Sequence, residues 1–434
     1  MTLSAPELAH VLLALGLLLA AAHGCGYLMT HFRQPRVIGE IVGGLLLGPT
    51  LFGAIAPSAQ AAAFPSTGSA PLVLDAMYQL GLLLLMFCAG AEIRGFFHRE
   101  ERRAVGWISV IGMLVPFAAG LLAVWAFHLR SLRGPASMDA AFIIVFGAAI
   151  AITSIPVISR IMFDLGILES AFARIVLGVA VVEDVVLYIL LAIALGLVSK
   201  GPAESWGLPV KLGISPGSAG NVAYHIVAEL GFLIVFLSLG PWLYKRLLHK
   251  YNPVKRASPI AFQIVFVLGL SSLAMWLGVV PLFGAFVAGL VVSTSTGEGA
   301  ARARESIKEF SFAFFIPVYF AIVGLRLDLL NNFSVLFFVP FFLFACAVKS
   351  LSVYAGARLG GEGTDASSNL AVALNARGGP GIVLASIALD AKIISQSFYS
   401  SLVMLAVLTS LLAGMWLSRI VRSGRSLREE APEG

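Results

Sequence analysis

The chain has 434 residues, of which 59% are hydrophobic and 12% charged, and its formal net charge is +6. These proportions, with a mean hydropathy of +0.94, lie outside the range of soluble globular domains and predict an all-α polytopic membrane protein. Spans of roughly 20 apolar residues leave almost no chain for a soluble catalytic or nucleotide-binding domain. The cationic surplus occurs in short clusters between apolar runs, so it indicates topology and no nucleic-acid partner.

About thirteen apolar segments follow one another, and we interpret each as a membrane-spanning helix. No Lys or Arg precedes the first segment, which favours a retained helix over a cleaved signal peptide. The three cysteines lie inside apolar segments without disulfide or metal-ligand spacing, and no cofactor is expected. The predicted spans are 8–30, 37–56, 71–93, 104–127, 138–161, 172–199, 221–244, 258–278, 281–296, 310–327, 334–357, 367–389 and 395–421.

The distribution of basic residues predicts the orientation of these helices. With the N-terminus outside, 21 of the 29 Lys and Arg residues fall in inner connections and 6 in outer ones. This is the asymmetry that the positive-inside rule describes. It predicts a multi-pass protein of the cell (inner) membrane with an outer N-terminus and a short cytoplasmic tail at 423–434. The two remaining cations, Lys349 and Arg377, lie within spans.

A short repeat relates the second and ninth helices. Residues 39–44 (GEIVGG) match residues 284–289 (GAFVAG), and Gly90 and Gly324 lie near the ends of the helices that follow. An offset of seven helices reverses the orientation in the bilayer, so the match predicts an inverted-topology repeat of helices 1–6 on helices 8–13. The alternative is ordinary close packing of helices at small residues.

The repeat is tested by the positions of helix-breaking residues. Residues 152–156 (ITSIP) interrupt the fifth helix, and residues 375–381 (NARGGPG) interrupt the twelfth, seven helices later. Proline removes a backbone donor and glycine weakens a helix, so both segments can unwind at the membrane midplane. Matched broken helices are typical of secondary transporters, whereas either one alone could be a simple kink.

Charged residues inside the spans indicate the site. Glu183 and Asp184 are adjacent in the middle of the sixth helix, and Lys349 lies in the middle of the eleventh. Each charge costs roughly 3 kcal/mol at the bilayer centre, and such residues usually pair or function. Neighbouring side chains on a helix point about 100° apart, so one acid can face a cavity while the other pairs with Lys349. Arg377 can organise the twelfth-helix break by donating to exposed carbonyls.

An ordered series of motifs resembles the monovalent cation:proton antiporter-2 family, which includes sodium/proton antiporters and Kef-type transporters. The resemblance covers residues 8–420. The Glu183-Asp184 pair departs from the family pattern, in which Asp-Asp or Gln-Asp is more usual. The motifs are 35–49 (PRVIGEIVGGLLLGP), 90–92 (GAE), Thr153-Ser154, Glu183-Asp184, 282–290 (LFGAFVAGL), 317–327 (PVYFAIVGLRL) and 375–378 (NARG).

The resemblance implies one transporter domain at 1–422 with two crossing broken helices. Helices 4–6 and 11–13 would form the ion-transport core, helices 1–3 and 8–10 a dimerisation part of a homodimer, and helix 7 (about 221–244) the connector. Asp184 would bind either a proton or a cation, and Glu183 would exchange a salt bridge with Lys349. Thr153 and Ser154 would offer oxygen ligands to the monovalent cation, because Na⁺ and K⁺ are hard ions.

We therefore expect a secondary transporter in the bilayer that exchanges a monovalent cation, Na⁺ before K⁺ or Li⁺, for protons and serves pH homeostasis. An enzyme is not expected, because no nucleophile pair or zinc-ligand spacing occurs. Two alternatives stay open. One is a sodium-coupled symporter, or an exporter of an organic or other cation, on the same fold. The other is a channel or membrane sensor.

Overall fold

The computed structural model describes residues 3–32, 34–92, 101–136, 138–198, 207–214, 219–247, 257–295 and 297–428. Within these ranges the regular structure is helical and no strand occurs. The prediction of an all-α fold is therefore confirmed. Residues 429–434 of the predicted tail, and residues 93, 199 and 296 at the ends of three predicted spans, lie outside the described residues.

Each of the thirteen predicted spans contains at least one helix among its described residues. Among the described residues, ten helices are long and apolar enough to cross a membrane, and α11 (Ala219–Ser238) with α12 (Gly240–Leu247) supplies one further span bent by 51°. The remaining two predicted spans contain shorter helices. The span 138–161 contains α7 (Asp139–Ala151) followed by α8 (Ile155–Asp164), and the span 281–296 contains α15 (Pro281–Ser293). The predicted span 310–327 is the second part of a longer helical run that begins at Glu298.

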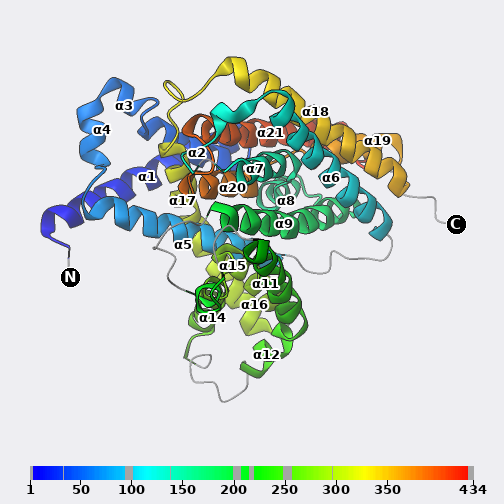
Figure 1. The fold of residues 1–434 in the computed structure, drawn as a ribbon, viewed down its shortest axis with the longest axis horizontal. Coiled ribbons are helices and arrows are strands. Elements are labelled where there is room, and N and C mark those ends of the chain that lie inside the picture. Colours follow the sequence, from blue (N-terminus) through cyan, green and yellow to red (C-terminus); the bar gives the residue numbers. More distant parts are fainter. Residues whose placement is uncertain are drawn as a thin grey trace. The chain divides into compact units, whose positions relative to one another are not determined.

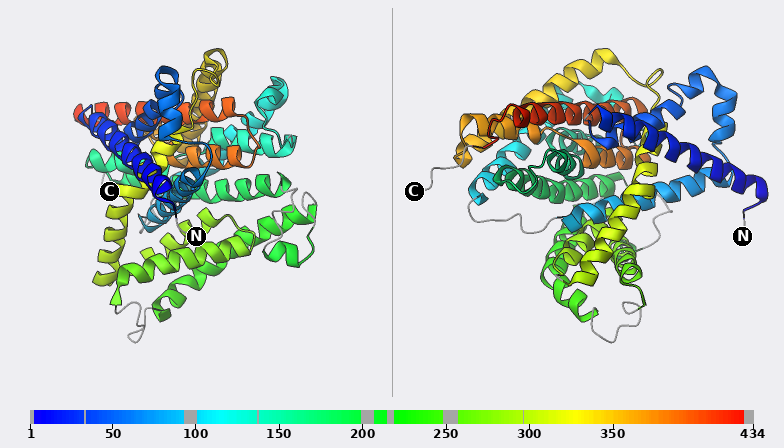
Figure 2. Two further views of the ribbon diagram at one scale, coloured as in Figure 1. Left: turned by 90° about the vertical axis from the view of Figure 1, so that its left-hand side faces the viewer. Right: turned by 180° about the vertical axis from the view of Figure 1, so that it is seen from behind.

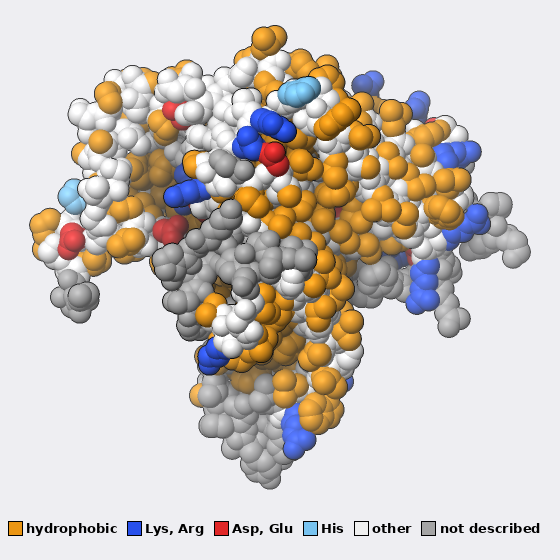
Figure 3. Space-filling view, viewed as in Figure 1, with side chains coloured by type: hydrophobic (Ala, Val, Ile, Leu, Met, Phe, Trp, Pro, Cys, Tyr) orange, Lys and Arg blue, Asp and Glu red, His pale blue; other side chains and the backbone are white. Residues whose placement is uncertain are grey.

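The sequence explains why these segments are helical and where several of them begin. Long apolar runs must satisfy their backbone groups internally, and a helix does so within one segment. Serine side chains directly before several helices accept hydrogen bonds from the first helical turn. Examples are Ser258 before α14 (Pro259–Trp276), Ser334 before α18 (Val335–Gly360) and Ser395 before α21 (Gln396–Arg422). Large apolar side chains remain exposed, and Figure 3 shows them over much of one face of the molecule. A surface of this kind suits contact with lipid.

The chain forms two compact units. Unit 1 consists of Met1–Arg94, Ala203–Gly213 and Val227–Asn331, and unit 2 consists of Gly95–Pro202, Ile214–Ile226 and Asn332–Gly434. Helix α11 begins in unit 2 and ends in unit 1. The elements of unit 1 are α1 (Ala5–His31), α2 (Arg36–Leu47), α3 (Phe52–Ile55), α4 (Pro57–Ala63), α5 (Ser69–Glu92), α10 (Leu208–Lys211), α12, α14 (Pro259–Trp276), α15 (Pro281–Ser293), α16 (Glu298–Phe310), the π-helical turn η3 (Ser311–Phe315) and α17 (Ile316–Leu325).

Unit 1 contains two helix crossings that involve the repeated glycines. In the crossing of α2 and α17, a Cβ atom on Gly44 would overlap the carbonyl of Ala321. In the crossing of α5 and α15, a Cβ atom on Gly289 would overlap the carbonyl of Phe87. Gly324 and Gly90 supply the second small residue of each crossing. Residues that correspond in the predicted repeat thus perform the same packing role in two different helix pairs.

Unit 2 places broken helices among continuous ones. Figures 1 and 2 show α7, α8 and α20 (Gly378–Asp390) in the interior of this unit, between α21 and α9 (Ala171–Val198). Helix α18 packs along α6. The elements of unit 2 are α6 (Arg102–Ala126), the 3-10 turn η1 (Leu129–Leu132), α7 (Asp139–Ala151), α8 (Ile155–Asp164), α9 (Ala171–Val198), α18 (Val335–Gly360), α19 (Thr364–Ala373), α20 (Gly378–Asp390) and α21 (Gln396–Arg422).

Candidate functional site

The fifth and twelfth predicted helices are both interrupted in unit 2. Helix α7 ends at Ala151 and α8 begins at Ile155, while α19 ends at Ala373 and α20 begins at Gly378. The interruption 152–154 precedes Pro156, which lies inside α8, and the interruption 374–377 precedes the glycines that open α20. The chain therefore leaves four helix ends, with their unpaired backbone groups, in the interior of the unit.

Hydrogen bonds join the two interruptions to each other. The N–H of Ser154 donates to the carbonyl of Ala376 at 2.7 Å, and the Thr153 hydroxyl donates to the carbonyl of Leu374 at 2.6 Å. Both hydroxyl residues are fully buried. The carbonyls after the C-terminal end of α19 thus accept hydrogen bonds from the other interruption. The two interruptions are therefore bonded directly to each other.

The Ser154 hydroxyl oxygen connects the N-terminal ends of the two outgoing half-helices. It accepts from the N–H of Gly379 in α20 at 2.9 Å and from the N–H of Val157 in α8 at 3.4 Å. A hydroxyl oxygen has two lone pairs, so both are engaged by these N–H donors. Ser154 therefore acts as a shared N-terminal cap for α8 and α20.

Lys349 brings α18, α6, α7 and α9 together at one buried point. Its Nζ atom lies 2.7 Å from Glu183 Oε1 and donates to the carbonyl of Gly112 at 3.0 Å and to the carbonyl of Ala151. Both charged side chains are 0% exposed. An ammonium group has three donors, and these three acceptors match that number. Because Ala151 is the last residue of α7, Lys349 also compensates the negative end of that half-helix.

Arg377 performs a similar role from the other interruption. Its guanidinium donates to the carbonyls of Ile150 at 3.0 Å and Ala345 at 2.8 Å, and to the side chain of Asn375. Its backbone N–H lies 3.3 Å from the hydroxyl oxygen of Thr409 in α21. The side chain is thus buried in a shell of carbonyl acceptors. It ties α20 to the last turn of α7.

Asp184 follows Glu183 in α9 and is 1% exposed. Its Oδ1 atom is buried and has no hydrogen-bond partner among the residues that the structure describes, and the same holds for Glu183 Oε2. The structure therefore joins Glu183 to Lys349, Thr153 and Ser154 to the second break, and Arg377 to the first. It records no hydrogen bond between Asp184 and any other predicted site residue.

Two buried acids of unit 2 were not singled out from the sequence. Glu101 accepts from Arg174 at 2.9 and 2.6 Å, and Glu362 accepts from Arg428 at 2.8 and 3.0 Å. Both acids lie beyond the ends of apolar runs, where a carboxylate is ordinarily solvated. Each is neutralised by a distant arginine, 73 residues along the chain for Glu101 and 66 residues for Glu362. Hydropathy gives no signal for such a long-range pair.

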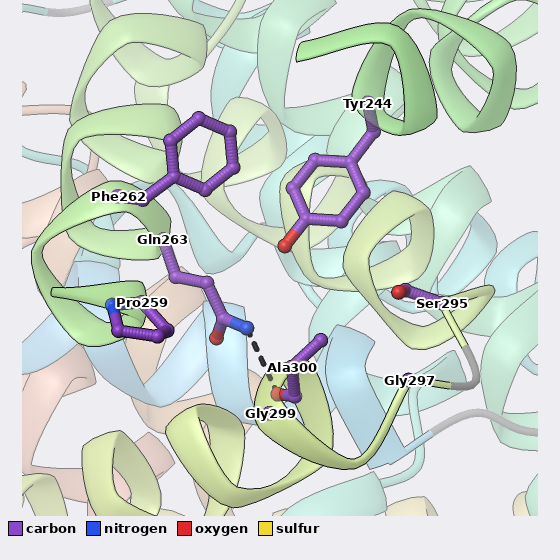
Figure 4. Close-up of a pocket in the computed structure, with 8 residues that line it drawn as sticks. All are labelled: Tyr244, Pro259, Phe262, Gln263, Ser295, Gly297, Gly299 and Ala300. Atoms are coloured by element: carbon purple, nitrogen blue, oxygen red, sulfur yellow. Dashed lines mark hydrogen bonds between the residues drawn. The ribbon is translucent and has the colours of Figure 1, made fainter. Parts of the chain in front are cut away.

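Unit 1 has a separate cavity of about 190 Å³ between α12, α14 and α16 (Figure 4). The hydroxyl of Tyr244 points toward this space, and Gln263 donates to the carbonyl of Ala300 at 2.9 Å. None of the predicted site residues belongs to its lining. The lining residues are Tyr244, Pro259, Phe262, Gln263, Ser295, Gly297, Gly299 and Ala300.

Comparisons with known proteins agree with this arrangement. The family model described as "Sodium/hydrogen exchanger, transmembrane" matches residues 17–423. The chain is 28% identical over 419 residues to the Na(+)/H(+) antiporter NhaS4 of Synechocystis sp., which covers 95% of this chain and 96% of that protein. It is 25% identical over 404 residues to a Na(+)/H(+) antiporter of Enterococcus hirae, covering 92% and 95%.

Two further comparisons bear on length and on fold. K(+)/H(+) antiporter 1 of Saccharomyces cerevisiae is 28% identical over 87% of this chain, and this match spans 42% of the yeast protein. The solved structure of the sodium proton antiporter MjNhaP1 from Methanocaldococcus jannaschii matches with a TM-score of 0.63 and 15% identity, covering 96% of this chain and 98% of that one. The predicted sodium/proton antiporter fold is confirmed. With the family model spanning nearly its whole length, the chain belongs to the sodium/hydrogen exchanger family.

Proposed function

We propose that this protein is a secondary transporter that exchanges a monovalent cation for protons, with Na⁺ the first candidate and K⁺ and Li⁺ the next. Family membership supports this proposal. Relatives that match along nearly their whole length are named as Na(+)/H(+) antiporters, and the yeast relative is named as a K(+)/H(+) antiporter. Exchange of this kind would serve pH homeostasis.

The observation that carries the proposal is the pair of adjacent buried acids in α9. Lys349 neutralises Glu183, whereas Asp184 Oδ1 has no hydrogen-bond partner among the described residues. An ionised carboxylate in such surroundings is costly, so it requires a proton or a bound cation. A proton and a cation cannot both neutralise one carboxylate. Competition at Asp184 therefore couples the two fluxes.

The neighbouring residues would divide the remaining tasks. Glu183 would exchange its salt bridge with Lys349 during the cycle, and Arg377 would hold the break in shape. Of the two hydroxyls proposed as cation ligands, Thr153 is better suited than Ser154. The Thr153 bond to Leu374 uses its proton and leaves its lone pairs for a cation, while both lone pairs of Ser154 are engaged.

For the whole cycle we propose alternating access, in which unit 2 carries the site and unit 1 forms a homodimer contact. Half-helix ends around a fixed site are the usual construction of such transporters. The protein would lie in the cell (inner) membrane with its N-terminus outside and the residues after α21 in the cytoplasm. Carriage of an uncompensated charged site through hydrocarbon would be costly, which limits leak.

The test is proton movement in proteoliposomes under an imposed pH gradient, with Na⁺, Li⁺ and K⁺ added in turn. We expect at least one ion to dissipate the gradient in the wild type. Asp184→Asn should abolish the response, because the amide neither ionises nor releases a proton. Lys349→Ala should reduce it.

The control combines Asp184→Asn with Asn375→Asp, which places a carboxyl group in the second break without altering α9. This double variant should still show no response to the added ions. If folded wild-type protein responds to none of the three ions between about pH 6 and pH 9, the exchange proposal fails for these ions. Solute uptake without proton movement would then favour a symporter.

A further inference from the structure

The corner between α18 and α19 carries a buried carboxylate. Gly361 adopts a positive φ of 97°, and the N–H groups of Gly361 and Glu362 bond back to the carbonyls of Arg358 and Ala357 at 3.1 and 3.0 Å. This glycine ending reverses the chain and directs Glu362 inward. The Glu362 side chain is 6% exposed. An ionised carboxylate so far from water is costly unless a cation lies close by.

That cation comes from the segment that follows α21. Arg428 Nε lies 2.8 Å from Glu362 Oε2, and its second guanidinium nitrogen lies 3.0 Å from Oε1. Two parallel bonds of this kind define direction as well as distance. Leu427, one residue earlier, is 8% exposed although it lies outside any helix. Leu427 and Arg428 therefore pack against the rest of unit 2, whereas residues 423–426 are exposed.

A second contact reaches α19 itself. Asn369, near the middle of α19, donates from Nδ2 to the carbonyl of Leu427 at 3.1 Å and accepts from Trp416 Nε1 in α21 at 3.0 Å. Its side chain is almost completely buried. One amide group thus binds α19 to α21 and to the segment after it. Both of its polar atoms are used.

These contacts are one short helix away from the interruption. Helix α19 has 10 residues, so it is about 15 Å long and behaves as a rigid rod at that length. The contact to Asn369 holds its second turn, and the contact to Glu362 holds the chain just before its first turn. At its other end, Leu374 accepts from the Thr153 hydroxyl and Ala376 accepts from the N–H of Ser154.

We propose that Leu427 and Arg428, at the end of the segment 423–428, form a clasp that acts through Glu362 and Asn369 to position α19 and so sets the cation affinity of the broken-helix site. This inference rests on the exchange function proposed above. The four residues are positioning residues, since they bind no ion themselves. When the clasp is open, α19 samples positions in which the carbonyl of Leu374 and the Thr153 hydroxyl are displaced.

The displaced positions of α19 predict a specific change in the kinetics of transport. If only a fraction of the molecules has α19 in the competent position, the apparent dissociation constant of the cation increases by the inverse of that fraction. At a saturating concentration of the cation, binding returns nearly all molecules to the competent position of α19. The KM for the cation should therefore rise while kcat changes little. A merely structural role would instead lower the amount of active protein and leave KM unchanged.

The experiment compares Arg428→Ala with Arg425→Ala in the full chain. Arg425 is an exposed arginine three residues away, so its replacement removes the same charge without opening the clasp. In proteoliposomes, Arg428→Ala should raise KM for the exchanged cation about 5-fold, a common size for coupling between sites, and Arg425→Ala should not. Arg428→Lys should bring KM part of the way back to the wild-type value. The double variant Glu362→Arg with Arg428→Glu, in which the two charges are exchanged, should bring it most of the way back.

Amide hydrogen exchange of α19 in the same variants gives a readout that does not require transport. Faster exchange of α19 in Arg428→Ala, and wild-type exchange in Arg425→Ala, would support the clasp. Equal exchange in both variants, or an unchanged KM in Arg428→Ala, would overturn it. If the wild type transports no cation, the exchange function fails, while hydrogen exchange still decides whether the clasp holds α19.

Discussion

Lys349 shows how a single side chain can serve two purposes in the interior of a membrane protein. It forms an ion pair with Glu183, and it satisfies the carbonyls of Gly112 and Ala151. Loss of the lysine would leave a buried carboxylate and two buried carbonyls without donors. Loss of the glutamate would leave a buried cation with only carbonyl partners. The pair therefore has a structural role in addition to any part in transport.

We predict that Lys349→Ala and Glu183→Ala each lower the free energy of unfolding by about 3–5 kcal/mol, the usual cost of breaking a buried ion pair. The double variant should be destabilised by less than the sum of the two, because no unpaired charge remains. Thermal unfolding in detergent, analysed as a double-mutant cycle, measures the coupling, which should exceed about 1 kcal/mol.

Leu351→Ala is the control for this cycle. Leu351 lies two residues from Lys349 in α18 and is 69% exposed, so its removal should leave the unfolding temperature close to that of the wild type. Additive single effects would contradict the coupled role of Lys349. The comparison also separates loss of stability from loss of transport, because the wild type and each of these variants can be assayed for transport in liposomes of the same composition.

At the scale of elements, the repeated glycines of unit 1 define two helix crossings. Gly44 and Gly324 lie between α2 and α17, and Gly90 and Gly289 lie between α5 and α15. In each case a Cβ atom would meet the backbone of the partner helix, which cannot move aside as a flexible side chain can. Close backbone approach at small residues is one means by which helices associate in lipid.

We predict that Gly44→Ala destabilises the protein by about 1–3 kcal/mol, the range for overpacking a tight contact. Gly16→Ala, in α1 of the same unit, provides the matched control. A Cβ atom on Gly16 would meet nothing within 4 Å, and alanine favours helix over glycine by up to about 1 kcal/mol. The measured unfolding temperature should therefore fall for Gly44→Ala and stay equal or rise for Gly16→Ala. Equal effects of the two substitutions would refute a tight crossing.

For the whole molecule, the sequence predicts the spans well because hydropathy acts locally. Each apolar run has to satisfy its own backbone, so its length and composition identify it. The two breaks were also predictable, since proline and glycine act through the backbone at their own positions. The start of the helical run at Glu298 was missed because Arg302, Arg304 and Lys308 interrupt the apolar pattern there.

Contacts between distant residues were beyond such reasoning. Sequence composition indicated that Lys349 needs an acidic partner, but not that Gly112 and Ala151 complete its shell. Arg377 was expected near carbonyls, yet the identity of Ile150 and Ala345 depends on how the two breaks cross. The pair Glu362–Arg428 gave no signal at all, since its residues are 66 positions apart and lie outside apolar runs.

Topology is the remaining property of the whole molecule that composition predicts. With 21 basic residues in the connections on one side and 6 on the other, the opposite orientation would require many more cations to cross the bilayer.

We predict that Ser131→Cys, in the exposed turn η1, reacts with a membrane-impermeant maleimide in intact cells. Arg425→Cys should react only after permeabilisation. Both variants are made in a background in which Cys25, Cys88 and Cys346 are replaced by alanine, and the opposite labelling pattern would reverse the proposed orientation.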